Sequence, residues 1–228
     1  MDSKLLGRIS IVALMLGTAT VACTPHSQMA GPATLSGEPV KGDRIAVKAA
    51  AAARDALARH NSRQAIAAAE RAVAASPRNA DYRMLLGQSY LSAGRFASAE
   101  TSFRDSLTLS PGQPRAAFDL ALAETAQGRG EDARALLASL GGVPAGDLGL
   151  AMVLAGDHEG GIAKLVAAAR RDDSTARVRQ NLALAYALDG KWNEARAVAM
   201  QDTVPARLDA QLSGCASLAG PNQARRQI

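Results

Sequence analysis

A period of 34 residues is the feature that most constrains how this chain can fold. The period relates Pro77 to Pro111 and Gly94 to Gly128. Because matching residues then stand at matching places in successive helix pairs, the period predicts stacked copies of one small unit, each of which buries its apolar face against its neighbours. The same step also relates three alanines at a place where two helices must approach closely: Ala65, Ala99 and Ala133.

The clearest copy runs from Asp81 to Pro111 and reads DYRMLLGQSYLSAGRFASAETSFRDSLTLSP. It predicts two amphipathic helices joined by a turn that contains Gly94. The pattern resembles the tetratricopeptide repeat, with Leu-Gly-x2-Tyr in the leading helix, Ala-x3-Phe in the trailing helix and a closing Pro. Arg83 stands where the Trp of that pattern is expected. The residues that match the pattern are Leu86, Gly87, Tyr90, Ala99, Phe103 and Pro111.

Four further copies are expected around this one. The first copy is degenerate, because alanines replace its Leu, Gly and Tyr. The third is shortened, since the Leu of the next copy, Leu148, follows Leu120 by only 28 residues and paired glycines at 141–142 end the trailing helix. Further pattern residues are Ala133, Leu182, Tyr186 and Ala195, and the expected bounds are about 46–79, 80–113, 114–141, 142–175 and 176–202.

The composition agrees with an all-helical chain. Apolar residues make up 48% of the sequence but aromatic residues only 3%, so alanine supplies much of the apolar content. Alanine is the best helix former and buries little surface, whereas a sheet would favour Val, Ile, Tyr and Phe. We therefore predict an all-α, right-handed superhelical tetratricopeptide-repeat solenoid over 44–218, with about five helix pairs and a capping helix at 205–218. A disordered tail is expected at 219–228.

Residues 1–22 are typical of an export signal. A short positive region precedes an apolar run and a stretch of small residues that ends just before Cys23. The apolar run is shorter than the roughly 20 residues that a membrane-spanning helix needs. One interpretation is cleavage by the ordinary signal peptidase after Ala22. The other is a bacterial lipoprotein signal, in which Cys23 becomes the acylated first residue.

The residues before and at Cys23 read TVAC and resemble the lipoprotein box, with Thr20 in place of the usual Leu. Acylation of Cys23 would anchor the chain, since each buried methylene contributes about 0.8 kcal/mol and stable anchoring takes more than one acyl chain. Thr24, rather than Asp, favours the outer membrane under the sorting rule of enteric lipoproteins; a soluble periplasmic protein is the alternative. The Pro-, Gly- and Ser-rich segment 23–43 is expected to be a flexible tether.

The sequence predicts no catalytic site, metal site or cofactor, because HExxH, CxxC and GxSxG motifs are absent. The formal net charge of +5 is spread along the chain, so nucleic-acid binding is not expected. Glu124, Glu131 and Asp132 are interpreted as solvated helix residues. Cys215 is interpreted as a small buried hydrophobe, with a reactive thiol or an intermolecular disulfide as alternatives.

Repeats of this kind present a concave groove lined by their leading helices. Counted from the first residue of each repeat, the second, fifth, ninth and twelfth stations lie on one face of the leading helix, which is mixed in polarity and suits an extended or helical peptide. We expect Phe118 with Arg115 to anchor a partner segment; alternatively Met84, Phe118 and Leu122 pack between helices. The groove candidates are Asp81, Met84, Gln88, Leu91, Arg115, Phe118, Leu122, Thr125, Leu150, Val153, Arg177, Gln180, Asn181 and Leu184.

The overall layout resembles the TadD family, the lipoproteins of the tight-adherence (Flp) pilus assembly system. The resemblance rests on this layout and on SPRNADYRMLLGQSYLSAGRFASAETSFRDSL and RVRQNLALAYALDGKWNEARAVAMQD. It implies a periplasm-facing outer-membrane lipoprotein that helps to assemble or localise the secretin channel and other pilus machinery through protein partners. Alternatives are a pilotin of type IV pili, a lipoprotein of the outer-membrane protein insertion machinery, and a generic periplasmic peptide-binding repeat protein.

Overall fold

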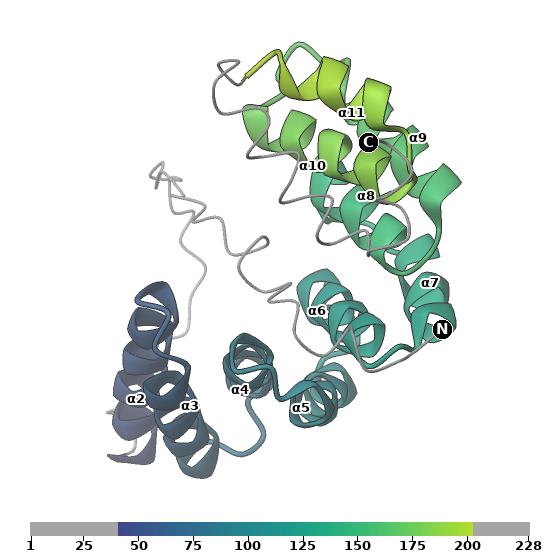
Figure 1. The fold of residues 1–228 in the computed structure, drawn as a ribbon. Helices are drawn as coiled ribbons and strands as arrows, with labels where there is room; N and C mark the ends of the chain where they lie inside the picture. Colours follow the sequence, from purple (N-terminus) through teal and green to yellow (C-terminus); the bar gives the residue numbers. More distant parts are fainter. Residues whose placement is uncertain (1–40, 203–228) are drawn as a thin grey trace, which may run out of the picture. The chain divides into compact units, whose positions relative to one another are not determined.

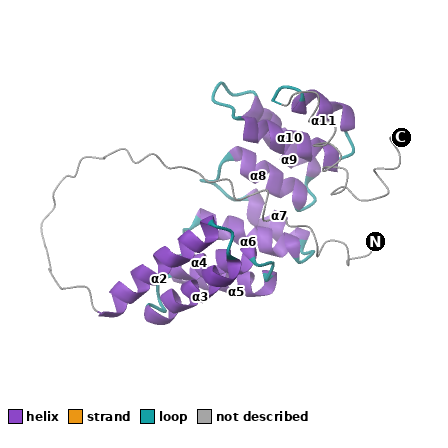
Figure 2. Ribbon diagram, turned by 60° about the vertical axis from the view of Figure 1, so that its left-hand side comes forward, coloured by secondary structure: helices purple, strands orange, loops and turns teal. Residues whose placement is uncertain are grey.

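The computed structural model describes residues 41–202, and every regular element in this range is a helix (Figure 2). The prediction of an all-α chain with about five helix pairs is confirmed. The predicted export signal, Cys23, the expected capping helix 205–218 and Cys215 lie outside the described residues. The pairs are α2 (Lys41–Ala58) with α3 (Ser62–Ala75), α4 (Ala80–Ser92) with α5 (Phe96–Leu109), α6 (Pro114–Ala126) with α7 (Gly130–Ala138), α8 (Ala145–Leu154) with α9 (His158–Ala169), and α10 (Ala176–Leu188) with α11 (Trp192–Ala199).

The described chain divides after Pro111 into two compact units. The N-terminal unit (41–111) holds α2 to α5, and the C-terminal unit (112–202) holds α6 to α11 (Figure 1). The sequence period predicted one uninterrupted stack and gave no sign of this division. Helix α2 begins at Lys41, so the helical part starts three residues before the expected position at 44.

A residue with positive φ closes the turn inside each helix pair. Gly94 has a φ of 71° between α4 and α5, and His60 has a φ of 55° at the matching place between α2 and α3. Glycine adopts this left-handed conformation without steric cost, whereas a side chain with a Cβ is strained there. The glycine period read from the sequence therefore marks these turns, which in the other three pairs contain Gly128, Gly156 and Gly190.

Side-chain caps fix the starts of several helices. The Asn79 side chain accepts a hydrogen bond from the backbone N–H of Tyr82 at the start of α4, and Asn61 does the same at the start of α3. Asp157 and Thr175 cap α9 and α10 in the same way. These residue types satisfy backbone donors that a helix start would otherwise leave without a partner.

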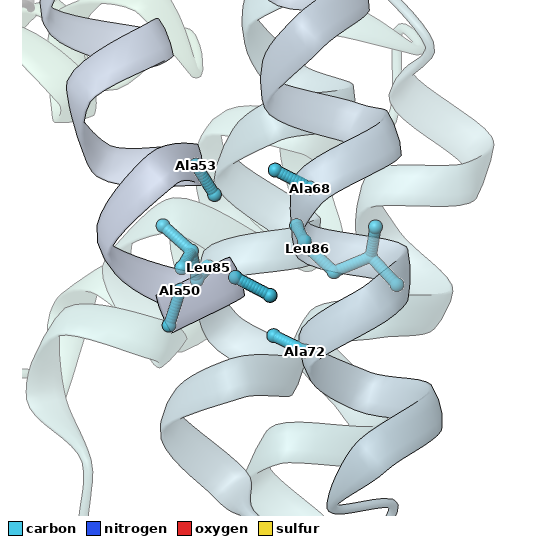
Figure 3. Close-up of a cluster of buried hydrophobic side chains, with 8 residues drawn as sticks. Ala50, Ala53, Ala68, Ala72, Leu85 and Leu86 are labelled. Atoms are coloured by element: carbon cyan, nitrogen blue, oxygen red, sulfur yellow. The ribbon is translucent and has the colours of Figure 1, made fainter. Parts of the chain in front are cut away.

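Alanine dominates the core of the N-terminal unit (Figure 3). Ala50 and Ala53 of α2 lie against Ala68 and Ala72 of α3, and leucines of α4 complete the cluster. Small side chains let the helix axes approach closely, but each buries little apolar surface. Of the three alanines that make the first repeat look degenerate in sequence, Ala53 and Ala56 are buried packing residues, whereas Ala52 is exposed.

Larger side chains make up the core between the last two helix pairs. Val153 of α8, Ile162 and Leu165 of α9, and Leu182 and Ala185 of α10 form one buried cluster. Upstream of it, α7 is only nine residues long, as expected from the shortened spacing of the third repeat. None of the helices described between residues 41 and 202 is both long enough and apolar enough to span a membrane.

Candidate functional site

The contact between the two helices of a pair sets which face each leading helix turns inward. A Cβ added to Gly87 of α4 would lie 2.6 Å from a ring carbon of Phe103 in α5. A Cβ added to Gly149 of α8 would lie 2.9 Å from the carbonyl oxygen of Gly161 in α9. These glycines stand at the eighth station of their repeats. The ninth station is turned about 100° from this contact, so we define the inner face by the second, fifth, ninth and twelfth stations.

The inner face of the N-terminal unit is open on α4. Asp81 is exposed, and Met84, Gln88 and Leu91 are half-buried. One carboxylate, one amide and two apolar side chains therefore share a face that a ligand can reach. Such a surface can accept hydrogen bonds from a peptide backbone or a basic side chain while its apolar members bury part of the ligand.

Tyr90 connects the second repeat to the first. Its hydroxyl donates a hydrogen bond of 2.8 Å to Glu70 of α3, and the Arg95 guanidinium lies 4.5 Å from the centre of its ring. Partial burial raises the pKa of the Tyr90 hydroxyl, and the hydrogen bond to Glu70 raises it further. This pattern residue therefore has a structural role that holds α4, and so the open face, against α3.

Arg115 and Phe118, the expected anchor, lie together in the C-terminal unit. The Arg115 guanidinium is 5.7 Å from the centre of the Phe118 ring and 3.0 Å from a carboxylate oxygen of Asp119. Arg115 is exposed, but the Phe118 side chain is only 2% exposed. In this structure Phe118 is therefore a packed residue, which is the second of the two interpretations that the sequence left open.

The other candidates of the C-terminal unit are also mainly buried or paired. Asn181 is buried and donates a hydrogen bond of 3.2 Å to the carbonyl oxygen of Gly146, which joins α10 to α8. Arg177 forms an ion pair of 3.0 Å with Asp147. Gln180 is exposed and Thr125 is half-buried. The apolar candidates Leu122, Leu150, Val153 and Leu184 are all buried.

One acidic residue was placed wrongly by sequence reasoning. Glu124 is 2% exposed rather than solvated, and it lies near Arg129, with a nitrogen–oxygen distance of 3.9 Å. Glu124 occupies the station of Tyr90 in the second repeat, and the Tyr90 side chain packs against the core of its unit. The repeat register could therefore have predicted that Glu124 is buried. Glu131 and Asp132 are exposed, as expected.

Several charged residues within 41–202 form ion pairs near the ends of helices. Among the described residues no three His, Cys, Asp or Glu side chains gather where they could hold a metal ion. His158 pairs with Asp189 at a distance of 3.2 Å, and Lys191 pairs with the same carboxylate at 2.8 Å. These contacts join the start of α9 to the turn after α10, so we interpret them as structural.

Comparisons with known proteins identify the repeat. Two tetratricopeptide-repeat family models match residues 50–114 and 90–147. The solved structure of TTC0263, a thermophilic tetratricopeptide-repeat protein of Thermus thermophilus, superposes with a TM-score of 0.61 and 19% identity over 75% of this chain and 98% of that one. The fold is that of a tetratricopeptide-repeat (TPR) protein. No curated protein matches the sequence.

Two further TPR structures are similar to this chain. PilF of Pseudomonas aeruginosa has a TM-score of 0.57 and 17% identity over 82% of this chain and 93% of that one. YrrB, described as a TPR protein with an unusual peptide-binding site, has a TM-score of 0.53 and 15% identity over 77% of this chain and 94% of that one. The TPR fold typically serves as a protein-interaction scaffold, and the comparisons indicate no catalytic family.

Proposed function

We propose that this protein is a non-enzymatic TPR lipoprotein of the outer membrane that assists the assembly or localisation of a Flp (tight-adherence) pilus secretin. The proposal rests on one combination: a sequence over 1–22 that is typical of an export signal and is followed by Cys23, a Pro-, Gly- and Ser-rich segment after it, and TPR repeats with an open inner face. In this arrangement the repeats face the periplasm and bind a protein partner, while the acylated Cys23 keeps them at the membrane.

The face that binds the partner in this proposal is the inner face of α4. Asp81 is placed to pair with a basic side chain, and the half-buried Met84 and Leu91 offer apolar contact. The partner is then a secretin segment that carries a basic residue beside apolar ones. The peptide-binding site ascribed to YrrB supports a peptide as the kind of ligand that a TPR face can hold.

A role in another assembly system is the second candidate. The similarity to PilF of Pseudomonas aeruginosa, a protein named for pili, keeps a pilotin of type IV pili as the first of these alternatives. A lipoprotein of the outer-membrane protein insertion machinery and a soluble periplasmic peptide-binding protein are the remaining ones. Adjacent genes for a secretin and a pilus ATPase would favour the Flp system over all of them.

The anchor is tested by metabolic labelling with palmitate. Wild-type protein is expected to incorporate the label and to fractionate with the outer membrane, whereas Cys23→Ala is expected to lose both properties. Cys215→Ala is the matched control and should label like the wild type. Equal labelling of wild type and Cys23→Ala would contradict the lipid anchor.

The role in assembly is tested by the amount of secretin multimer in the outer membrane. Loss of the protein is expected to reduce the multimer while secretin monomer is still made, because a scaffold acts after synthesis of its client. Unchanged multimer in cells without the protein would count against the Flp proposal.

A further inference from the structure

The positive charge of the described chain is not spread evenly along it, as we expected from the sequence, but is concentrated in the first helix pair. Residues 41–79, which include α2 and α3, carry eight basic and three acidic side chains, whereas residues 80–202 carry thirteen basic and fifteen acidic ones. The basic side chains described on α2, on α3 and in the turn between them are all exposed: Arg44, Lys48, Arg54, Arg59, Arg63 and Arg71. The first repeat therefore presents a surface of mainly positive charge.

Few of these charges are neutralised by acidic side chains of the repeat. Asp55 pairs with Arg59, and Glu70 accepts the hydrogen bond from the Tyr90 hydroxyl. Five of the exposed cations have no ion-pair partner among residues 41–202: Arg44, Lys48, Arg54, Arg63 and Arg71. These side chains are therefore available to an external anion.

The cations of α2 gather on the side of the helix opposite its alanine core. Arg44, Lys48 and Arg59 fall within about 60° of one another around the helix. The buried alanines of α2 point the other way, towards α3 (Figure 3). The chain reverses at His60, so Lys48, twelve residues before this turn, stands about level with Arg71, eleven residues after it. The basic surface therefore extends along both helices of the pair.

Two exposed apolar side chains lie beside these cations. Ile45 is 53% exposed and Val47 is 60% exposed, and they are next to Arg44 and Lys48 in the first turns of α2. The outer face of a terminal repeat must be polar for solubility, but solubility requires neither charges of one sign nor exposed branched apolar residues. A bilayer surface accounts for both, because its phosphate groups attract cations and its interfacial region takes up apolar side chains.

We propose that the exposed side of α2 and α3 binds the surface of a membrane that contains anionic phospholipids. Five of the six described cations are arginines, whose planar guanidinium matches phosphate oxygens in a bidentate geometry. The proposal requires neither acylation of Cys23 nor a secretin partner. If Cys23 is acylated, the surface is held close to a bilayer, because Lys41 follows Cys23 by 18 residues, which span at most about 65 Å.

Vesicle flotation tests the proposal. Both interpretations of the export signal predict a processed chain that begins at residue 23, and this chain is used with Cys23→Ala so that no acyl chain contributes. It should float with vesicles of phosphatidylglycerol and phosphatidylcholine in equal parts but not with vesicles of phosphatidylcholine alone. Binding should weaken as the salt concentration rises, because salt screens interactions between exposed charges. Equal binding to both kinds of vesicle, or binding to neither, would overturn the proposal.

Charge removal at matched positions tests where the membrane binds. Lys48→Gln/Arg71→Gln should weaken binding to the anionic vesicles at least about tenfold, because each basic side chain near an anionic surface contributes about fivefold to the affinity. Lys164→Gln/Arg170→Gln removes one lysine and one arginine at the C-terminal part of α9 and should leave the affinity unchanged. Circular dichroism checks that both variants are folded. Equal weakening in the two variants would show that net charge alone governs binding, and would overturn the placement on α2 and α3.

A dye whose emission depends on polarity gives a second readout. In the same chain with Cys215→Ser, the dye is attached to Val47→Cys, and its emission should shift to shorter wavelength when anionic vesicles are added. The same dye on Thr101→Cys, an exposed position of α5, should show no shift. A shift at position 101 as large as that at position 47, or no shift at either, would contradict the proposal. Because these tests use protein without an acyl chain and without a secretin, their failure is distinct from failure of the proposed function.

Discussion

At the scale of single residues, the repeat assigns each place a backbone conformation and a packing environment. His60 stands at the turn station that glycine fills in the other four pairs, and it keeps a φ of 55° there. Glu124 is buried at the station where the second repeat has Tyr90, which packs against the core of its unit. At both places the chain departs from the residue that suits the station best. Substitutions at such places therefore test whether the repeat register is correct.

Replacing His60 with Gly should stabilise the N-terminal unit. The left-handed conformation costs a side chain with a Cβ roughly 1–2 kcal/mol, and glycine loses part of this gain through its freer unfolded state, so we expect a net gain of up to about 1 kcal/mol. Gly94→Ala introduces the same strain at the matching turn and should destabilise the fold. Urea unfolding measures both changes. A destabilising His60→Gly would contradict the register of the first repeat.

Tyr90 should make stability depend on pH in the alkaline range. Its folded-state pKa is raised, first by burial and then by the hydrogen bond to Glu70. The protonated hydroxyl therefore stabilises the fold fully below its unfolded pKa of about 10, and this contribution is lost as pH rises through the folded-state pKa. Between about pH 9 and 11, Tyr90→Phe should lose less stability than the wild type. If the free energy of unfolding fell equally with pH in the wild type and in Tyr90→Phe, this role of Tyr90 would be contradicted.

At the scale of helices, close approach between the two members of a pair decides which face is turned inward. Gly149 and Gly161 bring α8 and α9 together so closely that a Cβ at either would lie within 3 Å of the backbone of the other helix. The eighth station is thereby fixed against the trailing helix. The ninth station, turned about 100° further round the helix, then lies on the inner face. The geometry of the groove thus depends on residues that never line it.

Gly149→Ala should destabilise the C-terminal unit by about 1–3 kcal/mol, because the added methyl group meets the Gly161 carbonyl oxygen and backbone cannot yield as a side chain does. Gly141→Ala is the matched control, since a Cβ there meets no atom within 4 Å and its φ is not positive. Thermal unfolding followed by circular dichroism separates the two. Equal melting temperatures for both variants would show that the helices can move apart freely.

At the scale of the whole molecule, periodicity revealed the five helix pairs but not how they group or which of their side chains are buried. The 34-residue step located the turns and the shortened α7, because these depend on local residue types. The division after Pro111 and the burial of Phe118 and Leu150 depend on packing between elements, which a period does not encode. Sequence therefore grouped the candidate groove residues by station but could not tell that Met84 would stay partly open while Phe118 would be covered.

The two units consequently differ in what they offer a partner. The N-terminal unit has an open face of mixed polarity on α4, and the C-terminal unit has an apolar face that is already buried. We infer that partner binding under native conditions begins at α4. The central claim of this account is that this face, held at the outer membrane, promotes secretin assembly.

The most direct measurement is the amount of secretin multimer in cells that carry Asp81→Lys/Leu91→Asp, which reverses the charge at position 81 and replaces the apolar side chain at position 91 with a carboxylate. The control is Thr101→Lys/Thr108→Asp, which places the same charges at exposed positions of the trailing helix α5. With both proteins folded and equally abundant, the account predicts that the multimer falls towards the level of cells without the protein only in the α4 variant. An amount of secretin multimer in the α4 variant equal to that in wild-type cells would contradict the claim.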